Sequence, residues 1–169
     1  MTTAAVLTAP FIPLAQRIHD EAAIERGAIL RIDHFLNHRV EPDFMAMLGA
    51  ALAERLGPFQ PELVLTAEAS GLPPAMATAA ALGIPMLYAK KYAPNVEAPA
   101  LSRIIPSPTK GGETRLVVSS RYLPGGMRVA IVDDFLSNGR TALALVEICG
   151  DAGAHVVGAG FVVEKVFQG

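Results

Sequence analysis

The stretch VAIVDDFLSNGRTA, from Val129 to Ala142, decides how the chain is expected to fold. Its first four residues form an apolar run that is typical of a buried strand in a parallel sheet. Two adjacent carboxylates, Asp133 and Asp134, follow at once, and a helical pattern begins near Gly139. In open parallel sheets, ligands bind beyond the carboxyl ends of the strands, where loops and helix N-termini meet. The stretch therefore predicts an α/β fold with a binding site at this strand end.

The rest of the chain predicts the same fold class through alternating helices and strands. Pro42 begins a helix to Leu56 in which Phe or Leu recurs every fourth residue, and Gly57 ends it. We expect further helices at about 11–26, 71–82 and 139–151, and strands at 63–67, 84–89, 114–120, 129–134 and 156–165. Residues 29–37 alternate too weakly for an assignment. The order predicts a parallel sheet with helices on both faces.

One long stretch, from Lys91 to Gly112, shows no persistent period. Prolines and glycines interrupt it repeatedly, and such residues mark turns and loops. A loop of this length in a compact domain is usually a functional lid or a mobile excursion, although a hairpin would also fit. We expect a mobile loop over about 91–112.

Size and charge exclude several classes of protein. A chain of 169 residues and 17.8 kDa fits a single domain. Its formal net charge of -2 gives no electrostatic footprint for nucleic acid, and no apolar run approaches the roughly 18 residues that suggest a membrane span. The N-terminus lacks the features of an export signal. The single cysteine, Cys149, cannot form an intrachain disulfide, so we expect a cytoplasmic protein without nucleic-acid or membrane partners.

The residues after the expected strand suggest the chemistry of the ligand. Two neighbouring carboxylates repel each other unless a cation or hydroxyl donors offset the repulsion, so a ligand with hydroxyl groups and Mg²⁺ would suit Asp133 and Asp134. Gly139 lets backbone amides surround a phosphate at a helix N-terminus, together with the hydroxyls of Ser137 and Thr141. Carboxylates for a sugar and amides for a phosphate predict a sugar-phosphate site.

Other interpretations of an acidic pair at a strand end stay open on the residues alone. Such a pair also occurs as a helix cap, in the metal-binding strand of a nucleotide hydrolase and in the acidic pocket of a receiver domain. A nucleotide hydrolase needs a GxxxxGK loop followed by Ser or Thr, and a dinucleotide-binding fold needs GxGxxG after a strand. Neither motif is present, which weakens both nucleotide interpretations. The histidines lack metal-ligand spacing, so we expect no zinc site and no metal held by the protein alone.

The same stretch resembles the phosphoribosyl pyrophosphate motif of the type I phosphoribosyltransferases. The variant that begins DDFL and continues to NG is similar to the xanthine phosphoribosyltransferase branch of that family. Three further segments resemble the same branch in the same order: LRIDHFLNH (residues 30–38), TAEASGLPPA (residues 66–75) and VVEKVFQ (residues 162–168). The resemblance covers most of the chain. It implies one phosphoribosyltransferase domain over residues 1–169, with a small hood from about residues 1–40 and the C-terminal end.

The resemblance also implies which residues hold phosphoribosyl pyrophosphate. Asp133 and Asp134 would bind the ribose hydroxyls as the catalytic pair. The pocket for the 5-phosphate would be formed by Ser137, Asn138, Gly139, Arg140 and Thr141. More typical members have threonine where Asn138 stands, and the amide of Asn138 can still donate a hydrogen bond.

A second loop and two lysines would hold the leaving group. The implied pyrophosphate loop is Glu68, Ala69, Ser70 and Gly71, whose backbone amides would face the diphosphate. Lys90 and Lys91 would neutralise pyrophosphate as point charges. The residues alone fit a solvated lysine pair equally well.

For the purine base, the resemblance points to Leu30, Asn37 and Lys165. Asn37 can both donate and accept at the edge of an oxidised purine, and Lys165 would meet an exocyclic oxygen of xanthine. Without the resemblance, Lys165 reads as a strand-end lysine, Asn37 as a turn residue and Leu30 as core. Members of the branch usually continue beyond Gln168 with a helix and strand that would help to cover the base.

The resemblance implies a reaction in which xanthine and phosphoribosyl pyrophosphate give xanthosine monophosphate and pyrophosphate. Mg²⁺ would be bound mainly through phosphoribosyl pyrophosphate, and the protein would be a homodimer. Guanine, hypoxanthine or adenine is the alternative base. A second class of function is a non-catalytic regulator that senses phosphoribosyl pyrophosphate, but the N-terminal residues show no basic patch and no clear recognition helix for DNA.

Overall fold

A six-stranded sheet forms the centre of the molecule in the computed structural model, which describes residues 9–25, 29–92, 100–106 and 112–165. The strands are β1 (Ala23–Glu25), β2 (Ile29–Arg31), β3 (Leu63–Ala67), β4 (Met86–Tyr92), β5 (Leu101–Pro106), β6 (Glu113–Val118), β7 (Arg128–Leu136) and β8 (His155–Glu164). The α-helices are α1 (Ile12–Glu21), α2 (Pro42–Leu56), α3 (Leu72–Leu82) and α4 (Arg140–Ala152), and 3-10 turns η1 and η2 cover Gly57–Phe59 and Ser120–Tyr122.

The central sheet has the strand order β5-β6-β4-β3-β7-β8. Strands β4, β3, β7 and β8 are parallel, as predicted from the alternating pattern. Strands β5 and β6 add an antiparallel edge beside β4. The structure therefore confirms an α/β fold with a mostly parallel sheet.

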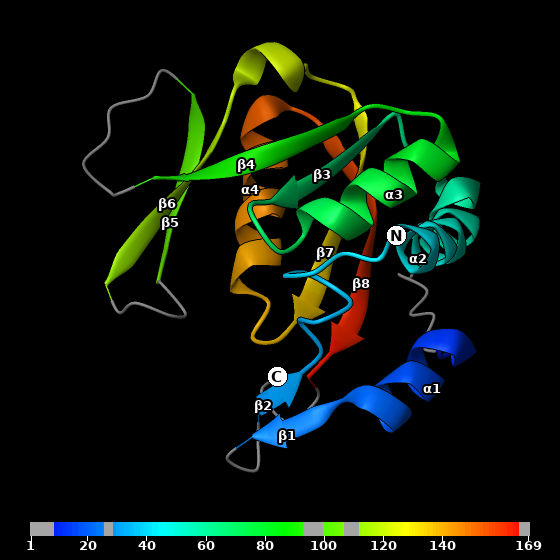
Figure 1. Ribbon diagram of the computed structural model, residues 1–169. Coiled ribbons are helices and arrows are strands. Elements are labelled where there is room, and N and C mark those ends of the chain that lie inside the picture. The colour runs from blue at the N-terminus through cyan, green and yellow to red at the C-terminus, as the bar shows by residue number, and fades with distance from the viewer. Residues whose placement is uncertain (1–8, 26–28, 93–99, 107–111, 166–169) are drawn as a thin grey trace.

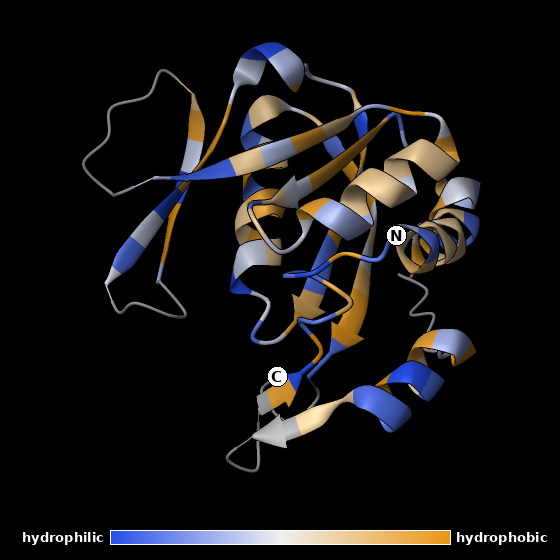
Figure 2. Ribbon diagram, in the orientation of Figure 1, coloured by the Kyte–Doolittle hydropathy of each residue, from blue (hydrophilic) through white to orange (hydrophobic). Residues whose placement is uncertain are grey.

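Helices cover both faces of the sheet, as Figure 1 shows. On one face, Leu65 and Ile131 pack with Leu145 of α4. On the other, Val64 and Val132 pack against α2 and α3. Adjacent strand residues point to opposite faces, so strands buried on both sides have the continuous apolar runs seen in the sequence. Figure 2 shows these strands and inner helices in hydrophobic colours, whereas much of α1 is hydrophilic.

The segment 91–112, expected as a loop, contains the whole of β5 in its described part. Its residues pair antiparallel with β6 from Leu101 opposite Val118 to Pro106 opposite Glu113. The hairpin, which the sequence left as the alternative, is therefore correct for this part of the segment. Prolines hid it because Pro106 lies at the end of an edge strand, where a missing amide hydrogen costs no ladder bond. Residues 93–99 and 107–111 lie outside the described part.

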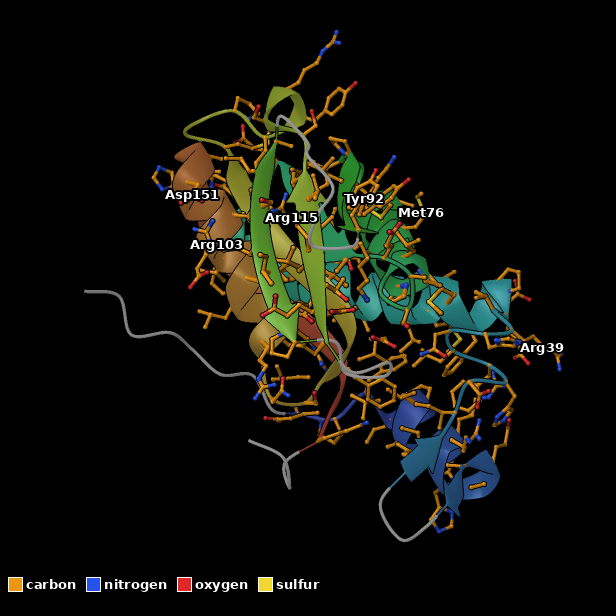
Figure 3. All side chains as sticks on the ribbon, turned by 90° about the vertical axis from the view of Figure 1, so that its left-hand side faces the viewer. Arg39, Met76, Tyr92, Arg103, Arg115 and Asp151 are labelled. Atoms are coloured by element: carbon orange, nitrogen blue, oxygen red, sulfur yellow. The ribbon has the colours of Figure 1, made fainter. Side chains whose placement is uncertain are left out.

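Arg103 fastens the β5–β6 hairpin to the outer side of α4. Its Nε lies 2.8 Å from Oε2 of Glu147, and its Nη1 lies 2.5 Å from Oδ2 of Asp151. Figure 3 shows Arg103 and Asp151 next to each other at this edge. The two carboxylates stand one helical turn apart, so a single guanidinium can contact both.

A small lobe lies beyond the carboxyl ends of β7 and β8 and is built from α1, β1 and β2 (Figure 1). Its buried side chains form a separate cluster around Leu14, Ile32 and Phe35, which Phe135 joins from β7. The helix expected over 11–26 ends at Glu21, because residues 23–25 instead pair antiparallel with residues 29–31. The lobe thus covers the strand ends where the acidic pair lies.

Candidate active site

The acidic pair lies near the carboxyl end of β7, held by main-chain and side-chain hydrogen bonds. The amide of Asp134 donates to Oδ1 of Asp133 at 2.9 Å, and the amide of Phe135 donates to Oδ1 of Asp134 at 2.9 Å. Oδ2 of Asp134, a residue only 7% exposed, accepts a hydrogen bond of 2.6 Å from the side-chain amide of Asn37. These bonds give each carboxylate a defined orientation.

Asp133 has an unusual affinity for protons. Its burial and the adjacent charge of Asp134 raise the pKa of Asp133 to about 7, while Lys91 acts in the opposite direction. Both dominant causes disfavour the charged carboxylate. An ionised Asp133 would bind the hydroxyl donors of a ligand best. In the empty site, burial and the charge of Asp134 make this ionised form less favourable.

The loop after the acidic pair forms a pocket with Asp133 at the start of α4. The five residues predicted for a phosphate line this pocket, together with Ala142 and with residues from β7 and β8. The complete lining is Asp133, Phe135, Leu136, Ser137, Asn138, Gly139, Arg140, Thr141, Ala142 and Phe161. Gly139 precedes the helix with φ 70°, a left-handed conformation that glycine adopts without strain. The loop thus brings small polar groups and the positive end of the α4 dipole to one place.

Asn138 has a structural contact within this loop. Its Oδ1 accepts a hydrogen bond of 3.2 Å from the amide of Arg140. The oxygen therefore satisfies one of the free amides at the helix start, and the NH₂ group of Asn138 takes no part in this contact.

The turn from Glu68 to Gly71 connects β3 to α3 and lies directly against Asp133. Gly71 is buried, and a Cβ atom at this position would lie 2.3 Å from Oδ1 of Asp133. No side chain fits there, so glycine allows the turn to approach the acidic pair. Ala69 and Ser70 are exposed at the tip, and the peptide bond between Glu68 and Ala69 is cis. The structure thus brings the two predicted loops together.

Lys90 and Lys91 are both exposed on β4. Neighbouring residues on a strand point to opposite faces, so one of the two at most can face the acidic pair. Lys91 lies on the same face of β4 as Ala89, which packs in one cluster with Ile131 of β7, two residues before Asp133. The amide of Lys91 also donates to Oε1 of Glu68 at 2.5 Å, which ties the end of β4 to the turn.

The residues predicted for the base divide into two groups. Asn37 and Lys165 both lie against the acidic end of β7: Asn37 bonds to Asp134, and the Lys165 ammonium lies 4.7 Å from the ring centroid of Phe135. The amide of Lys165 also donates to the carbonyl oxygen of Leu136 at 2.8 Å. Leu30 packs against the hydrophobic cluster of the small lobe, as expected for a core residue.

Two aromatic residues at the site were missed by the sequence analysis. Phe135 lines the pocket beside Asp133 and lies beneath the ammonium of Lys165. Phe161 lines the same pocket from β8, where it pairs with Asp133. Phe135 directly follows the acidic pair in the sequence, and this position could have predicted that it lies near the site. Phe161 became adjacent only through strand pairing, which the sequence does not display.

Comparison with known proteins agrees with this arrangement. Residues 39–166 match the model of the phosphoribosyl transferase domain. A curated xanthine phosphoribosyltransferase of Chloroflexus aurantiacus is 59% identical over 162 residues, which cover 96% of this chain and 77% of the relative. A curated xanthine phosphoribosyltransferase of Deinococcus deserti is 40% identical over 156 residues, which cover 92% of this chain and 81% of the relative.

Solved structures show the same fold. The adenine phosphoribosyltransferase of Saccharomyces cerevisiae superposes with a TM-score of 0.73 at 21% identity, covering 94% of this chain and 92% of that one. The adenine phosphoribosyltransferase of Rhodothermus marinus also gives a TM-score of 0.73, at 20% identity, covering 93% of this chain and 89% of that one. These two establish the fold, and the sequence match extends over most of the residues. The chain therefore belongs to the phosphoribosyltransferase family.

Proposed function

We propose that the protein is a purine-salvage enzyme that converts xanthine and phosphoribosyl pyrophosphate to xanthosine monophosphate and pyrophosphate. The observation that carries the proposal is one cluster of three parts: the acidic pair, the phosphate-loop pocket beside Asp133 and the turn at Gly71 packed against the same carboxylate. Xanthine is the base that the names of relatives with 59% and 40% identity support.

The three parts suit the three parts of phosphoribosyl pyrophosphate. Backbone amides at the start of α4 and the hydroxyls of Ser137 and Thr141 would hold the 5-phosphate. Asp133 and Asp134 would accept hydrogen bonds from the ribose hydroxyls. The turn from Glu68 to Gly71 would face the diphosphate, and Lys91 would add a positive charge beside it.

In this reaction the bond from ribose C1 to a diphosphate oxygen breaks, and a bond from C1 to a ring nitrogen of the base forms. The diphosphate leaves with the bonding electrons, and the nitrogen loses its proton. Positive charge grows on the ribose as in other oxocarbenium-like glycosyl transfers. The carboxylate of Asp133 would stabilise that charge, and the amides of the turn would stabilise the departing diphosphate. Catalysis would then be electrostatic, without a covalent intermediate on the protein.

Mg²⁺ fits this donor set as an ion that is bound mainly through the substrate. Within the part of the chain that the structure describes, no three His, Cys, Asp or Glu side chains gather as a metal site. The ribose and diphosphate oxygens of phosphoribosyl pyrophosphate offer the hard ligands that Mg²⁺ prefers. When bound, the ion would neutralise charge on the leaving diphosphate.

Asn37 and Lys165 would recognise the base next to the acidic pair. Lys165 would donate to an exocyclic oxygen of xanthine from above Phe135, whose ring offers an apolar surface to a planar purine. The side-chain NH₂ group of Asn37 donates one hydrogen bond to Asp134, and its second N–H and its carbonyl oxygen would remain for the base. Leu30 would contribute through the packing of the small lobe that covers the site.

Two further features belong to this proposal. A homodimer is supported by exposed apolar side chains on neighbouring elements, such as Met76 on α3 and Tyr92 on β4 (Figure 3). A cytoplasmic location is supported by the buried free thiol of Cys149. None of the helices in the described ranges is both long and apolar enough to span a bilayer.

The test is product formation with four bases in parallel. The purified protein is incubated with phosphoribosyl pyrophosphate, Mg²⁺ and either xanthine, guanine, hypoxanthine or adenine, and the nucleotides are separated by chromatography. We expect the highest kcat/KM with xanthine. Exclusive use of adenine would refute the base assignment. Binding of phosphoribosyl pyrophosphate without turnover of any base would favour the regulatory sensor.

A further inference from the structure

Thr66, the penultimate residue of β3, has a buried hydroxyl without a hydrogen-bond partner. The residue is 0% exposed, and its Oγ1 contacts no donor or acceptor in the ranges that the structure describes. Burying a hydroxyl in this state is unfavourable, so native proteins usually provide a partner. Thr78 on α3 is equally buried, and its hydroxyl donates to the carbonyl oxygen of Pro74 at 2.7 Å.

The hydroxyl of Thr66 lies beside the carboxylate of Asp133. A Cβ atom built on Gly71 would lie 2.2 Å from Oγ1 of Thr66 and 2.3 Å from Oδ1 of Asp133. Both oxygens are thus close to one point, and they are no more than about 4.5 Å apart. Glycine at position 71 leaves the space between them open. Rotation of the Thr66 or Asp133 side chain is the movement that would bring the two oxygens to hydrogen-bond distance.

The carboxylate of Asp133 can accept a further hydrogen bond. Its Oδ1 accepts one hydrogen bond, from the amide of Asp134, and a carboxylate oxygen can accept two. The charged groups that act on Asp133 are Asp134, on the same strand, and Lys91, on β4. Burial and Asp134 both oppose ionisation, so a hydroxyl that donates to the charged form would favour the state that binds ribose hydroxyls.

We propose that Thr66 is a positioning residue for Asp133, whose hydroxyl donates to Oδ1 when the carboxylate is ionised and so orients it toward the ribose of phosphoribosyl pyrophosphate. The inference rests on the proposed function, because Asp133 is assigned to ribose there. Thr66 itself would touch no substrate. Among the described residues, the hydroxyl of Thr66 has no partner in the empty site. It would then donate to Asp133 once that carboxylate is ionised.

The competing explanation is that threonine is present only because β-branched residues suit a buried strand. Valine would serve that purpose equally well, and it has nearly the shape of threonine without the hydroxyl. Thr66→Val therefore separates the two explanations. Thr66→Ser keeps the hydroxyl and loses the methyl group, and Thr78→Val removes an equally buried hydroxyl away from Asp133.

Steady-state kinetics with xanthine and varied phosphoribosyl pyrophosphate provide the first readout. We expect Thr66→Val to lower kcat/KM by about tenfold or more, the size of one hydrogen bond to a charged group. Its midpoint of urea unfolding should equal or exceed that of the wild type, because an unpaired buried hydroxyl is gone. Thr66→Ser should stay within about threefold of the wild type, less than one such bond, and Thr78→Val should keep wild-type kinetics. Wild-type kinetics in Thr66→Val, or an equal loss in Thr66→Ser, would overturn the proposal.

A second readout requires no turnover and so separates this inference from the proposed function. The carboxyl carbon of Asp133 is followed by NMR as the pH of the ligand-free protein is changed. The titration midpoint should rise in Thr66→Val and stay at the wild-type position in Thr66→Ser and Thr78→Val. An unchanged midpoint in Thr66→Val would refute the role of Thr66. Lack of activity with all four bases would refute the proposed function alone.

Discussion

Replacing Asp133 with asparagine should change how the stability of the ligand-free protein depends on pH. In the folded protein, burial and Asp134 raise the pKa of Asp133 to about 7 from an ordinary value of 3.8. Between these values the folded state binds a proton that the unfolded state has lost. The resulting stabilisation is fully present below the ordinary pKa and is lost as the pH rises through about 7.

The size of the effect follows from the difference between the two pKa values. At pH 5, about two units below the folded pKa, each unit corresponds to roughly 1.4 kcal/mol. The wild type should therefore lose about 2 to 3 kcal/mol of unfolding free energy from this group between roughly pH 5 and pH 8.5. Asp133→Asn has no such group, so its free energy should lack this part of the decline.

The assay is urea unfolding of both proteins at several pH values, followed by circular dichroism. Groups away from the acidic pair contribute equally to both proteins, so the difference between wild type and variant isolates the titration of the acidic pair. Asp43→Asn, a change at an exposed position on α2, is the matched control and should decline like the wild type. An equally steep decline in Asp133→Asn would refute the assignment of a raised pKa to this carboxyl.

Three further substitutions test the geometry of the site. Asp134→Asn should weaken the binding of phosphoribosyl pyrophosphate at least about tenfold, as expected for a lost charge-assisted bond; calorimetric titration showing equal affinity would remove Asp134 from the site. Gly71→Ala should abolish measurable turnover in the nucleotide assay, because the added Cβ would lie 2.2 Å from Oγ1 of Thr66, and full activity would contradict this close approach. Asn37→Ala should cost about 1 to 3 kcal/mol in urea unfolding, since the 2.6 Å bond to buried Asp134 is lost; unchanged stability would contradict that bond.

Local patterns in the sequence predicted the elements that build the sheet. The strands at β3 and β7 and the helices α2 and α4 have uninterrupted apolar runs or a clear helical period, since the strands lie inside the sheet and the helices pack on its two faces. A pocket at this loop was also predictable, because most of its lining residues are contiguous in the sequence. Contacts within ten residues of one another can be inferred from spacing alone.

Contacts between distant segments could not be predicted in the same way. Asn37 and Asp134 are 97 positions apart, and their bond depends on how the small lobe sits over the sheet. Phe161 meets Asp133 only through the register of β7 and β8. Strand β5 ends in a proline and includes polar residues, as an edge strand can, so its sequence was not distinguished from that of a loop.

Helix α4 contacts a different part of the molecule at each of its two ends. Its first residues line the pocket beside Asp133, and Glu147 and Asp151 near its other end form ion pairs with Arg103. With 13 residues the helix extends about 20 Å, so it connects the pocket beside Asp133 to the edge strand β5. A different hairpin in place of β5 and β6 must therefore keep a cation at position 103. Otherwise Glu147 and Asp151 near the C-terminal end of α4 must be redesigned with it.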